Sequence, residues 1–226
     1  NAFTPQFALL KKLDNNSSLY ANAAKSFKMP TFTQIYGGGG ANFAANPLLE
    51  PEEGWTYEFG YKKTSNTSMF KAALYYMDLD TIEYEGKGTS SNPYVTRNMS
   101  FKNKGLEMTY EKDFGSKYSY SLGANFCNPM GKNKKGVWER KFAREQYNAG
   151  IKYHDAKFNA ALTGMFTTDR ASGWGDLLPV NFIAGYKFDK SNSVELGVEN
   201  IFDRDDIVSN PGSATKYYCL PRMVHV

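Results

Sequence analysis

Residues 46–63, Asn-Pro-Leu-Leu-Glu-Pro-Glu-Glu-Gly-Trp-Thr-Tyr-Glu-Phe-Gly-Tyr-Lys-Lys, decide the fold of this chain. From Trp55 to Tyr61 every second residue is aromatic, and the residues between them are polar or small. Successive side chains of a β-strand point to opposite faces, so this segment predicts a strand with one aromatic face and one polar face. Pro47 and Pro51 precede the alternation, where a missing backbone donor does not interrupt a strand ladder. The fold therefore depends on what the aromatic face contacts.

The composition favours strands with two unlike faces. Aromatic residues make up 15% of the 226 residues, yet the mean hydropathy is −0.55, so aromatic side chains alternate with polar ones. A single all-β domain of this length is common. The longest apolar run, 72–77, is far shorter than the ~20 residues that a membrane-spanning helix needs. The net charge of +4 is too small and too dispersed to indicate a nucleic-acid partner.

Alternating segments recur along the whole chain. Strands are predicted at residues 4–13, 18–28, 53–63, 69–85, 95–112, 117–127, 142–153, 157–168, 179–188 and 193–202, with a partial strand at 217–226. Tight turns near residues 15, 66, 114, 155 and 190 alternate with longer loops at 29–50, 86–94, 128–141, 169–178 and 203–216. The turns therefore gather on one rim and the loops on the other. Strands of ~10 residues with this rhythm are typical of a transmembrane β-barrel wall.

Aromatic residues close to the tight turns fit the same interpretation. They are Tyr61, Tyr110, Tyr118, Tyr153, Phe158 and Phe188. Outer-membrane barrels carry such aromatic girdles at the membrane interfaces. The predicted fold class is therefore all-β, an antiparallel up-and-down transmembrane β-barrel. A soluble β-sandwich or propeller is the alternative, since its buried faces alternate as well.

Three stretches carry a family resemblance. Residues 26–36 contain Phe27-Lys28-Met29-Pro30-Thr31 and then Ile35-Tyr36, residues 46–61 contain Asn-Pro-Leu-Leu-Glu-Pro-Glu and then Tyr-Glu-Phe-Gly-Tyr, and residues 196–204 read Leu-Gly-Val-Glu-Asn-Ile-Phe-Asp-Arg. With the weaker Lys104-Gly105-Leu106-Glu107 match, their order and spacing resemble the C-terminal barrel half of TonB-dependent outer-membrane receptors. The resemblance covers nearly the whole chain. It departs at the end, where Leu220-Pro221-Arg222 replaces the family's Gly-Arg and the chain stops at Val226 instead of an aromatic residue.

The resemblance implies that residues 1–226 are the C-terminal part of a receptor barrel of about 22 strands, with about 10 or 11 strands present and the plug domain absent. An open sheet leaves two unpaired edges in lipid, where each unsatisfied peptide group costs several kcal/mol, so a fragment or truncated copy of a larger receptor is expected. An intact receptor of this kind lies in the bacterial outer membrane. It binds a scarce nutrient, usually a ferric siderophore, haem or cobalamin, and the TonB system displaces its plug.

The resemblance also implies which partners and which chemistry to expect. The expected partners are a small-molecule ligand, outer-membrane lipid and lipopolysaccharide, together with the TonB system through the plug. Catalysis has no place in this mechanism, and no resident cofactor is expected beyond a ligand such as a ferric chelate or haem. No metal site made of side chains is expected either, because neither His154 nor His225 has a second ligand at helical or hairpin spacing.

Candidate ligand-binding residues follow from loop position. Aromatic side chains can stack on a ligand and cations attract anionic metal chelates, which selects Tyr36, Phe43, Arg97, Trp138, Arg140 and Trp174. For Tyr36 and Phe43 the competing interpretation is packing of the loops on one another. For the basic segment around Trp138 it is a solvated surface, or a surface that holds lipopolysaccharide phosphates.

Two other classes of protein fit part of the pattern. A plug-less porin-like or lipid-transporting outer-membrane barrel would share the wall. A soluble carbohydrate-binding β-domain would bury the aromatic faces in a sandwich core and dissolve without detergent. An enzyme is not expected, because no Ser–His–Asp order, carboxylate pair or phosphate loop stands in a setting that supports chemistry.

Overall fold

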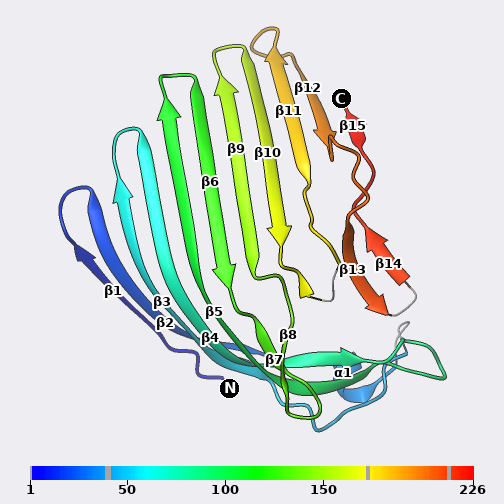
Figure 1. Ribbon diagram of the computed structural model, residues 1–226. Coiled ribbons are helices and arrows are strands. Elements are labelled where there is room, and N and C mark those ends of the chain that lie inside the picture. Colours follow the sequence, from blue (N-terminus) through cyan, green and yellow to red (C-terminus); the bar gives the residue numbers. More distant parts are fainter. Residues whose placement is uncertain (1, 39–41, 172–173, 213–214) are drawn as a thin grey trace.

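The computed structural model describes residues 2–38, 42–171, 174–212 and 215–226. Most of these residues form one curved antiparallel sheet (Figure 1). Its strands follow one another as β1 (Gln6–Lys12), β2 (Ser17–Lys28), β3 (Glu52–Thr64), β4 (Ser68–Glu85), β5 (Val95–Phe114), β6 (Tyr118–Cys127), β9 (Glu145–His154), β10 (Phe158–Thr168), β11 (Val180–Lys187), β12 (Ser193–Glu199) and β15 (Met223–His225). We call this succession the wall. It confirms the predicted all-β antiparallel architecture.

Turns and loops lie at opposite ends of the wall, as predicted. The short connections β1–β2, β3–β4, β5–β6, β9–β10 and β11–β12 share one end in Figure 1, and the longer segments share the other. The longest pair, β4 and β5, stays in register from Ser68 opposite Lys112 to Glu85 opposite Val95. These two strands therefore project beyond their neighbours at the loop end and support the loops there.

The register lines up side chains of one kind across the wall. One face carries the successive cross-strand partners Ala21, Phe59, Leu74, Leu106 and Phe126. The opposite face carries Tyr20, Gly60, Ala73, Glu107, Asn125 and Gln146. We call these the apolar face and the polar face. Their separation follows from the period-2 alternation of the sequence.

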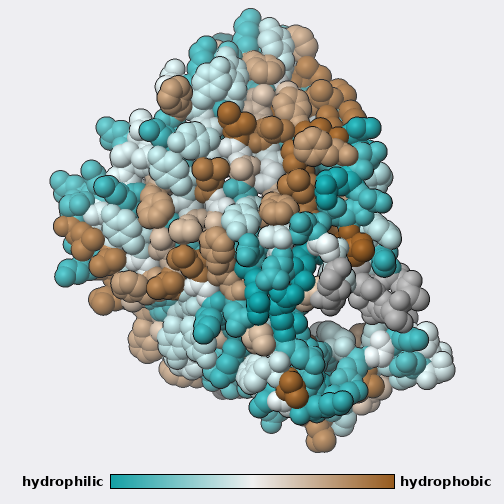
Figure 2. Space-filling view, in the orientation of Figure 1, coloured by the Kyte–Doolittle hydropathy of each residue, from teal (hydrophilic) through white to brown (hydrophobic). Residues whose placement is uncertain are grey.

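The apolar face is exposed. Phe59 and Leu74 are 54% and 59% exposed, whereas a sandwich core would bury both. Burial of such a side chain stabilises a fold by ~1.5–3 kcal/mol, so a face of this size needs an apolar environment, as the wall of a membrane barrel does. Figure 2 shows brown and pale side chains over the strands and a concentration of teal, hydrophilic ones toward the loop end.

Aromatic rings gather near both ends of the apolar face. Near the turns, the ring centroid of Tyr153 lies 5.0 Å from that of Tyr118 and 5.8 Å from that of Phe158. Toward the loops, the rings of Trp55 and Tyr57 are stacked with centroids 6.0 Å apart. Two aromatic bands with aliphatic residues between them are the arrangement of interfacial girdles.

The loop end contains short elements where loops were predicted. α1 (Phe32–Tyr36) lies in the first loop, β7 (Met130–Lys132) pairs with β5 and with β8 (Trp138–Arg140), and β13 (Ile207–Gly212) pairs with β14 (Thr215–Tyr218) in a separate sheet. The predicted strand 217–226 is therefore divided: its start belongs to β14, and Met223–His225 joins the wall as β15. Pro221, which has no backbone donor, lies between the two parts. Among the described residues no helix has the length and apolar character needed to cross a membrane.

The wall is open within the part of the chain that the structure describes. Its path ends at β1, which pairs with β2, and at β15, which pairs with β12. These edge strands lie at the left and the right of the sheet in Figure 1. An unpaired edge is tolerated poorly in hydrocarbon, where each orphan backbone group costs several kcal/mol. Further strands would have to pair with both edges to close a barrel.

Candidate functional site

The longer connections fold into one assembly at the loop end, which we call the rim. It consists of the described residues of segments 29–51, 128–144, 169–179 and 200–206, together with the projecting β4–β5 hairpin (residues 77–103). All the candidate ligand-binding residues belong to it. The structure shows which of them hold the rim together and which are exposed on its surface.

Helix α1 fixes the first loop. Thr31 Oγ1 accepts a hydrogen bond from Gln34 N at 3.3 Å, and Gln34 Oε1 accepts one from Thr31 N at 2.7 Å, which is a capping box. Gln34 Nε2 donates to the hydroxyl of Tyr84 at 2.5 Å and so attaches the helix to β4. Gly37 ends the helix at φ +75°, and a Cβ there would lie 2.8 Å from the carbonyl oxygen of Phe43. Glycine is therefore required at this position.

Phe43 packs inside the rim. Its ring centroid lies 5.7 Å from that of Tyr84 and 5.3 Å from that of Tyr94. Close by, Asn46 Nδ2 donates to the carbonyl oxygen of Thr96 at 2.7 Å, and Thr96 is completely buried. Phe43 thus holds the first loop against the β4–β5 hairpin.

Tyr36 has a different setting. Its side chain is 68% exposed, and its ring centroid lies 5.6 Å from that of Phe32, which is 82% exposed. Helix α1 therefore presents two neighbouring aromatic rings, from its first and last residues, to the surroundings of the rim. Such a pair can stack on a flat or aromatic ligand.

Arg97 is bound between two carboxylates. Its guanidinium pairs with Glu83 and lies 3.4 Å from Glu85 Oε1. Lys141 Nζ lies 2.5 Å from Glu83 Oε1, and Lys134 Nζ lies 3.4 Å from Glu85 Oε2. Glu83 and Arg97 are cross-strand partners, whereas both lysines come from the segment around β7 and β8. This network joins that segment to the hairpin.

Trp138 lies between cations on the other side of the hairpin. The Nζ atoms of Lys102 and Lys132 lie 5.6 and 5.8 Å from its ring centroid, within cation–π range. The ring is 38% exposed. Lys102 and Arg97 occupy even and odd positions of β5, so they point to opposite faces of the strand. Trp138 and Arg97 therefore cannot contact one small ligand on the same face.

Arg140 and Trp174 connect the loops further along. Arg140 pairs with Asp169, and this hydrogen-bonded guanidinium lowers the pKa of the Asp169 carboxyl below its usual range. Arg140 Nη2 also donates to the carbonyl oxygen of Arg170 at 3.0 Å. The guanidinium of Arg170 lies 5.3 Å from the Trp174 ring centroid, and its Nη1 donates to Ile207 O at 2.6 Å. These contacts tie β8 to segment 169–179 and to β13.

Several residues of the rim were not singled out from the sequence. Glu83 is the first of these residues. The sequence does contain a signal for it, because Glu83 and Arg97 are equally distant from the middle of the predicted loop 86–94, which indicates a cross-strand pair. The pattern Thr31-x-x-Gln34 likewise indicates a capped helix. Lys141 gives no such signal, because it reaches Glu83 from 58 positions away.

The polar face has its own hollow, of about 260 Å³, among the strands β4, β5, β6 and β9. Tyr75, Asn125, Gln146 and Asn148 contribute to its lining, and the Tyr75 hydroxyl donates to Asn125 Oδ1 at 3.0 Å. A lining of amide and hydroxyl groups suits water or polar chain inside a barrel. No cluster of three or more His, Cys, Asp or Glu side chains able to hold a metal ion occurs in the described ranges.

Comparison with known proteins gives both a family and a fold. The family model described as TonB dependent receptor-like, beta-barrel matches residues 1–201. Among solved structures, the chain is similar to the copper transporter OprC at 14% identity, with a TM-score of 0.73 over 96% of this chain and 38% of that one. It is also similar to a mutant ferric enterobactin receptor, PfeA, from Pseudomonas aeruginosa (18% identity, TM-score 0.73, 98% and 39% coverage). The ferric citrate transporter FecA matches at 19% identity, with a TM-score of 0.71 and 98% and 37% coverage.

The chain thus spans less than two fifths of the length of each of these structures. At such identities the structures show a shared fold, whereas the family match covers most of the chain. Receptors of this family lie in the outer membrane of Gram-negative bacteria, which accounts for the exposed apolar face and the two aromatic bands. The chain belongs to the TonB-dependent receptor β-barrel family.

Proposed function

We propose that this chain forms part of the wall and rim of an outer-membrane receptor that takes up a scarce nutrient by a TonB-dependent route, first of all a ferric siderophore. The family match over residues 1–201 carries the proposal. The similar solved structures include receptors named for ferric enterobactin, ferric citrate and ferripyoverdine, which supports an iron chelate as the first substrate class to test. Haem and cobalamin are the next classes, and the copper transporter adds copper.

In this proposal residues 1–226 are a C-terminal part of the barrel, and the plug domain belongs to the rest of the receptor. The TonB system acts through that plug. A soluble carbohydrate-binding domain is disfavoured by the exposure of Phe59 and Leu74, because a sandwich core would bury these side chains. Uptake, not catalysis, is the activity that a wall with a rim of loops supports.

Within the rim, the ligand-contacting role falls first to Tyr36, which stands in an exposed aromatic pair. Trp138 lies against Lys102, which shares the apolar face of β5 with Leu106, so its ring belongs to the outer side of the wall. The other candidates act as positioning residues, because their side chains are engaged inside the rim: Phe43, Arg97, Arg140 and Trp174.

The test uses the intact receptor that carries residues 1–226. Its gene is deleted in the Gram-negative host, and growth is measured under iron limitation with ferric enterobactin, ferric citrate or ferripyoverdine as the iron source. Loss of growth on at least one chelate, reproduced by inactivation of TonB, is expected. Uptake that continues without TonB would contradict the proposal and favour a passive porin-like or lipid-transporting barrel. Haem, cobalamin and copper uptake are measured in parallel.

Ligand contact is tested by truncating the exposed rings. Tyr36→Ala is expected to weaken binding of the transported chelate by about 2- to 10-fold, because one aromatic contact contributes ~0.5–1.5 kcal/mol, whereas Trp138→Ala on the outer side of the wall is expected to leave it unchanged. Phe114→Ala is the matched control, since Phe114 is 69% exposed at the turn end. Equal affinities of Tyr36→Ala and Phe114→Ala for the chelate would remove Tyr36 from the binding site.

A further inference from the structure

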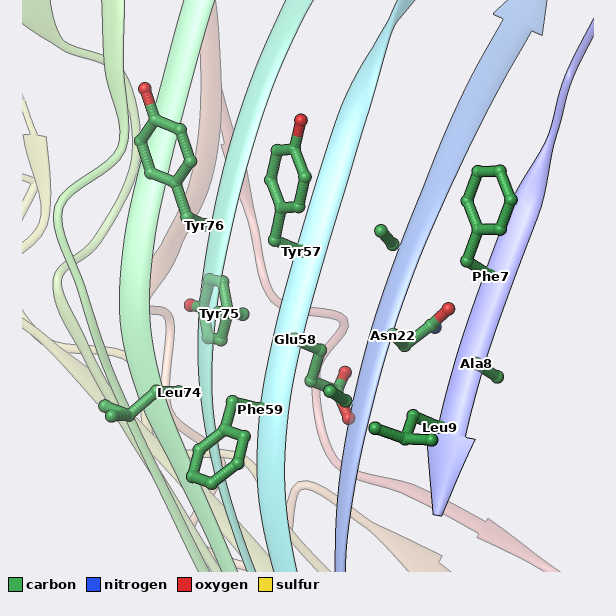
Figure 3. A pocket seen from close by; sticks show the side chains of 12 residues that line it. Phe7, Ala8, Leu9, Asn22, Tyr57, Glu58, Phe59, Leu74, Tyr75 and Tyr76 are labelled. Atoms are coloured by element: carbon green, nitrogen blue, oxygen red, sulfur yellow. The ribbon is translucent and has the colours of Figure 1, made fainter.

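A trough runs along β2 on the apolar face, with a volume of about 520 Å³. Its sides are formed by Phe7 and Leu9 of β1 and by Tyr57, Phe59, Leu74 and Tyr76 of β3 and β4 (Figure 3). Its floor is formed by Ala21 and Ala23 of β2. The trough therefore exists because two small residues follow one another on one face of a strand whose neighbours carry large side chains.

The strand register builds this shape. Ala23 is paired with Phe7 on one side and with Tyr57 on the other, so a methyl group lies between two rings. Figure 3 shows the hydroxyl of Tyr57 at the end of the ring that points along the strands, away from Phe59. Asn22 and Glu58 also border the trough, but they alternate with its floor and sides and so belong to the polar face. The apolar face contributes hydrocarbon and rings to the lining.

The loop end of the trough changes from apolar to charged. Lys25 follows Ala23 by two positions and so lies on the same face of β2. Its cross-strand partner is Trp55, which stacks on Tyr57. Lys25 Nζ lies 3.0 Å from Glu53 Oε2, and an ammonium group has three donors, so this pairing leaves donors for a second acceptor.

We propose that the trough holds one acyl chain of lipopolysaccharide in the outer leaflet, with a phosphate of the headgroup bound by Lys25. The occupant is a lipid because the trough opens on the apolar face, where Phe59 and Leu74 of the interior strands β3 and β4 are 54% and 59% exposed, and this face meets the hydrocarbon of the outer membrane. Toward the loop end, the apolar floor is followed by the aromatic band and then by Lys25. This is the order of acyl chain, interface and phosphate in a lipid molecule of the outer leaflet. The site depends on the membrane location of the barrel and not on which nutrient is transported.

Filling the trough tests the acyl-chain part. Native mass spectrometry counts the lipopolysaccharide molecules that the intact receptor retains after purification from outer membranes in mild detergent. Ala23→Leu places a larger side chain on the floor, and Ala149→Leu makes the same change on the apolar face of β9, away from the trough. We expect a several-fold loss of retained lipid in Ala23→Leu and none in Ala149→Leu. Equal retention in both variants, or equal loss, overturns the proposal.

A second variant guards against a folding defect. Phe7→Ala removes one side of the trough without overfilling it, and it is expected to lose lipid as Ala23→Leu does. Far-UV circular dichroism in detergent verifies that each variant has kept its β structure. Retention of lipid by a folded Phe7→Ala receptor at the wild-type level counts against the trough.

The headgroup part is tested with defined lipids. Delipidated receptor is mixed with bis-phosphorylated lipid A, with dephosphorylated lipid A or with phosphatidylethanolamine. Lys25→Gln is expected to reduce retention of the phosphorylated form to that of the dephosphorylated form, whereas Lys63→Gln, at the turn end of the same face, leaves it unchanged. Equal retention of both lipid A forms by the unaltered receptor refutes the role of Lys25. Preference for phosphatidylethanolamine refutes lipopolysaccharide as the occupant.

Discussion

Glu50 and Asn98 hold each other through two reciprocal hydrogen bonds. Glu50 N donates to Asn98 Oδ1 at 3.0 Å, and Asn98 Nδ2 donates to the carbonyl oxygen of Glu50 at 2.9 Å. Two residues further on, Glu52 Oε1 accepts a hydrogen bond from Ile82 N at 2.9 Å. The end of the first loop is thereby attached to both strands of the β4–β5 hairpin by hydrogen bonds that each join a backbone group to a side chain. The loop is held by a specific polar clamp as well as by the packing of Phe43.

Loss of the Asn98 amide is expected to loosen the first loop. Each hydrogen bond contributes about 0.5–1.5 kcal/mol, so Asn98→Ala should lower the local stability of residues 42–50 by ~1–3 kcal/mol. Hydrogen exchange of these residues in the intact receptor measures the change. Asn66→Ala, in an exposed turn at the opposite end of the wall, is the control. Unchanged exchange in Asn98→Ala would mean that aromatic packing alone holds the loop.

Arg97 and Glu83 are expected to act as one unit. If Arg97 positions the loops through Glu83, the variants Arg97→Ala and Glu83→Ala should weaken ligand binding to a similar extent, and the double variant should add little. Coupling between contacting residues typically amounts to ~0.5–3 kcal/mol. Chelate affinity of the intact receptor is measured for both single variants and the double variant. Lys87→Ala, in the exposed loop 86–94, is the control for loss of a positive charge.

Additive effects would have a different meaning. Arg97 would then contact the ligand directly, and its pairing with Glu83 would be incidental. A deficit in Arg97→Ala with none in Glu83→Ala would lead to the same conclusion.

Gly60 is required by the ring of Tyr20. The two residues are cross-strand partners on the polar face, and a Cβ at Gly60 would lie 2.2 Å from a ring carbon of Tyr20. Gly60→Ala must displace the ring and is expected to destabilise the barrel by ~1–3 kcal/mol, as overpacking does. Gly164→Ala is the matched control, because a Cβ there would meet its nearest neighbour at an ordinary 3.4 Å. Thermal unfolding of the intact receptor in detergent compares the two, and equal midpoints would contradict the prediction.

The wall could be predicted from the sequence because its signals are local. Strands such as β6 alternate between apolar residues and polar or small ones, and tight turns such as 14–17 are short and polar. Each hairpin then follows from its own turn. Its register also follows, as the pairing of Thr64 with Met69 across the turn near residue 66 illustrates.

The rim could be predicted only in part, because its contacts join segments that are distant in the sequence. Nothing near Trp138 indicates that Lys102 lies against its ring, and nothing near Arg140 indicates that its partner is Asp169. The hairpins β7–β8 and β13–β14 are short, so few alternating positions mark them. Loop position identified candidate residues, but their roles depend on these distant partners.

Asp206 forms a contact that should be sensitive to acid. Its carboxylate accepts hydrogen bonds from Arg204 at 2.7 and 2.8 Å and from the backbone N of Leu178 at 2.9 Å, and the side chain is 10% exposed. The Arg204 hydrogen bonds lower the pKa of the Asp206 carboxyl below its usual range. Asp206 therefore links segment 200–206 to segment 169–179 through its charged form.

A carboxyl group whose pKa is lowered by folding contributes stability above its unfolded pKa, about 3.9 for aspartate, and loses it as the pH falls through the lowered value. The protection factor of the Leu178 amide, which corrects for the intrinsic pH dependence of exchange, should therefore stay constant down to about pH 4 and fall below it. Asp206→Asn should reduce this protection at neutral pH and abolish its acid dependence, because the amide cannot form the charged pair with Arg204. Asp205→Asn, at an exposed neighbouring position, should behave like the unaltered receptor. An acid-dependent loss that persists in Asp206→Asn would assign the titration to another group, and Asp169, paired with Arg140, would be the next to test.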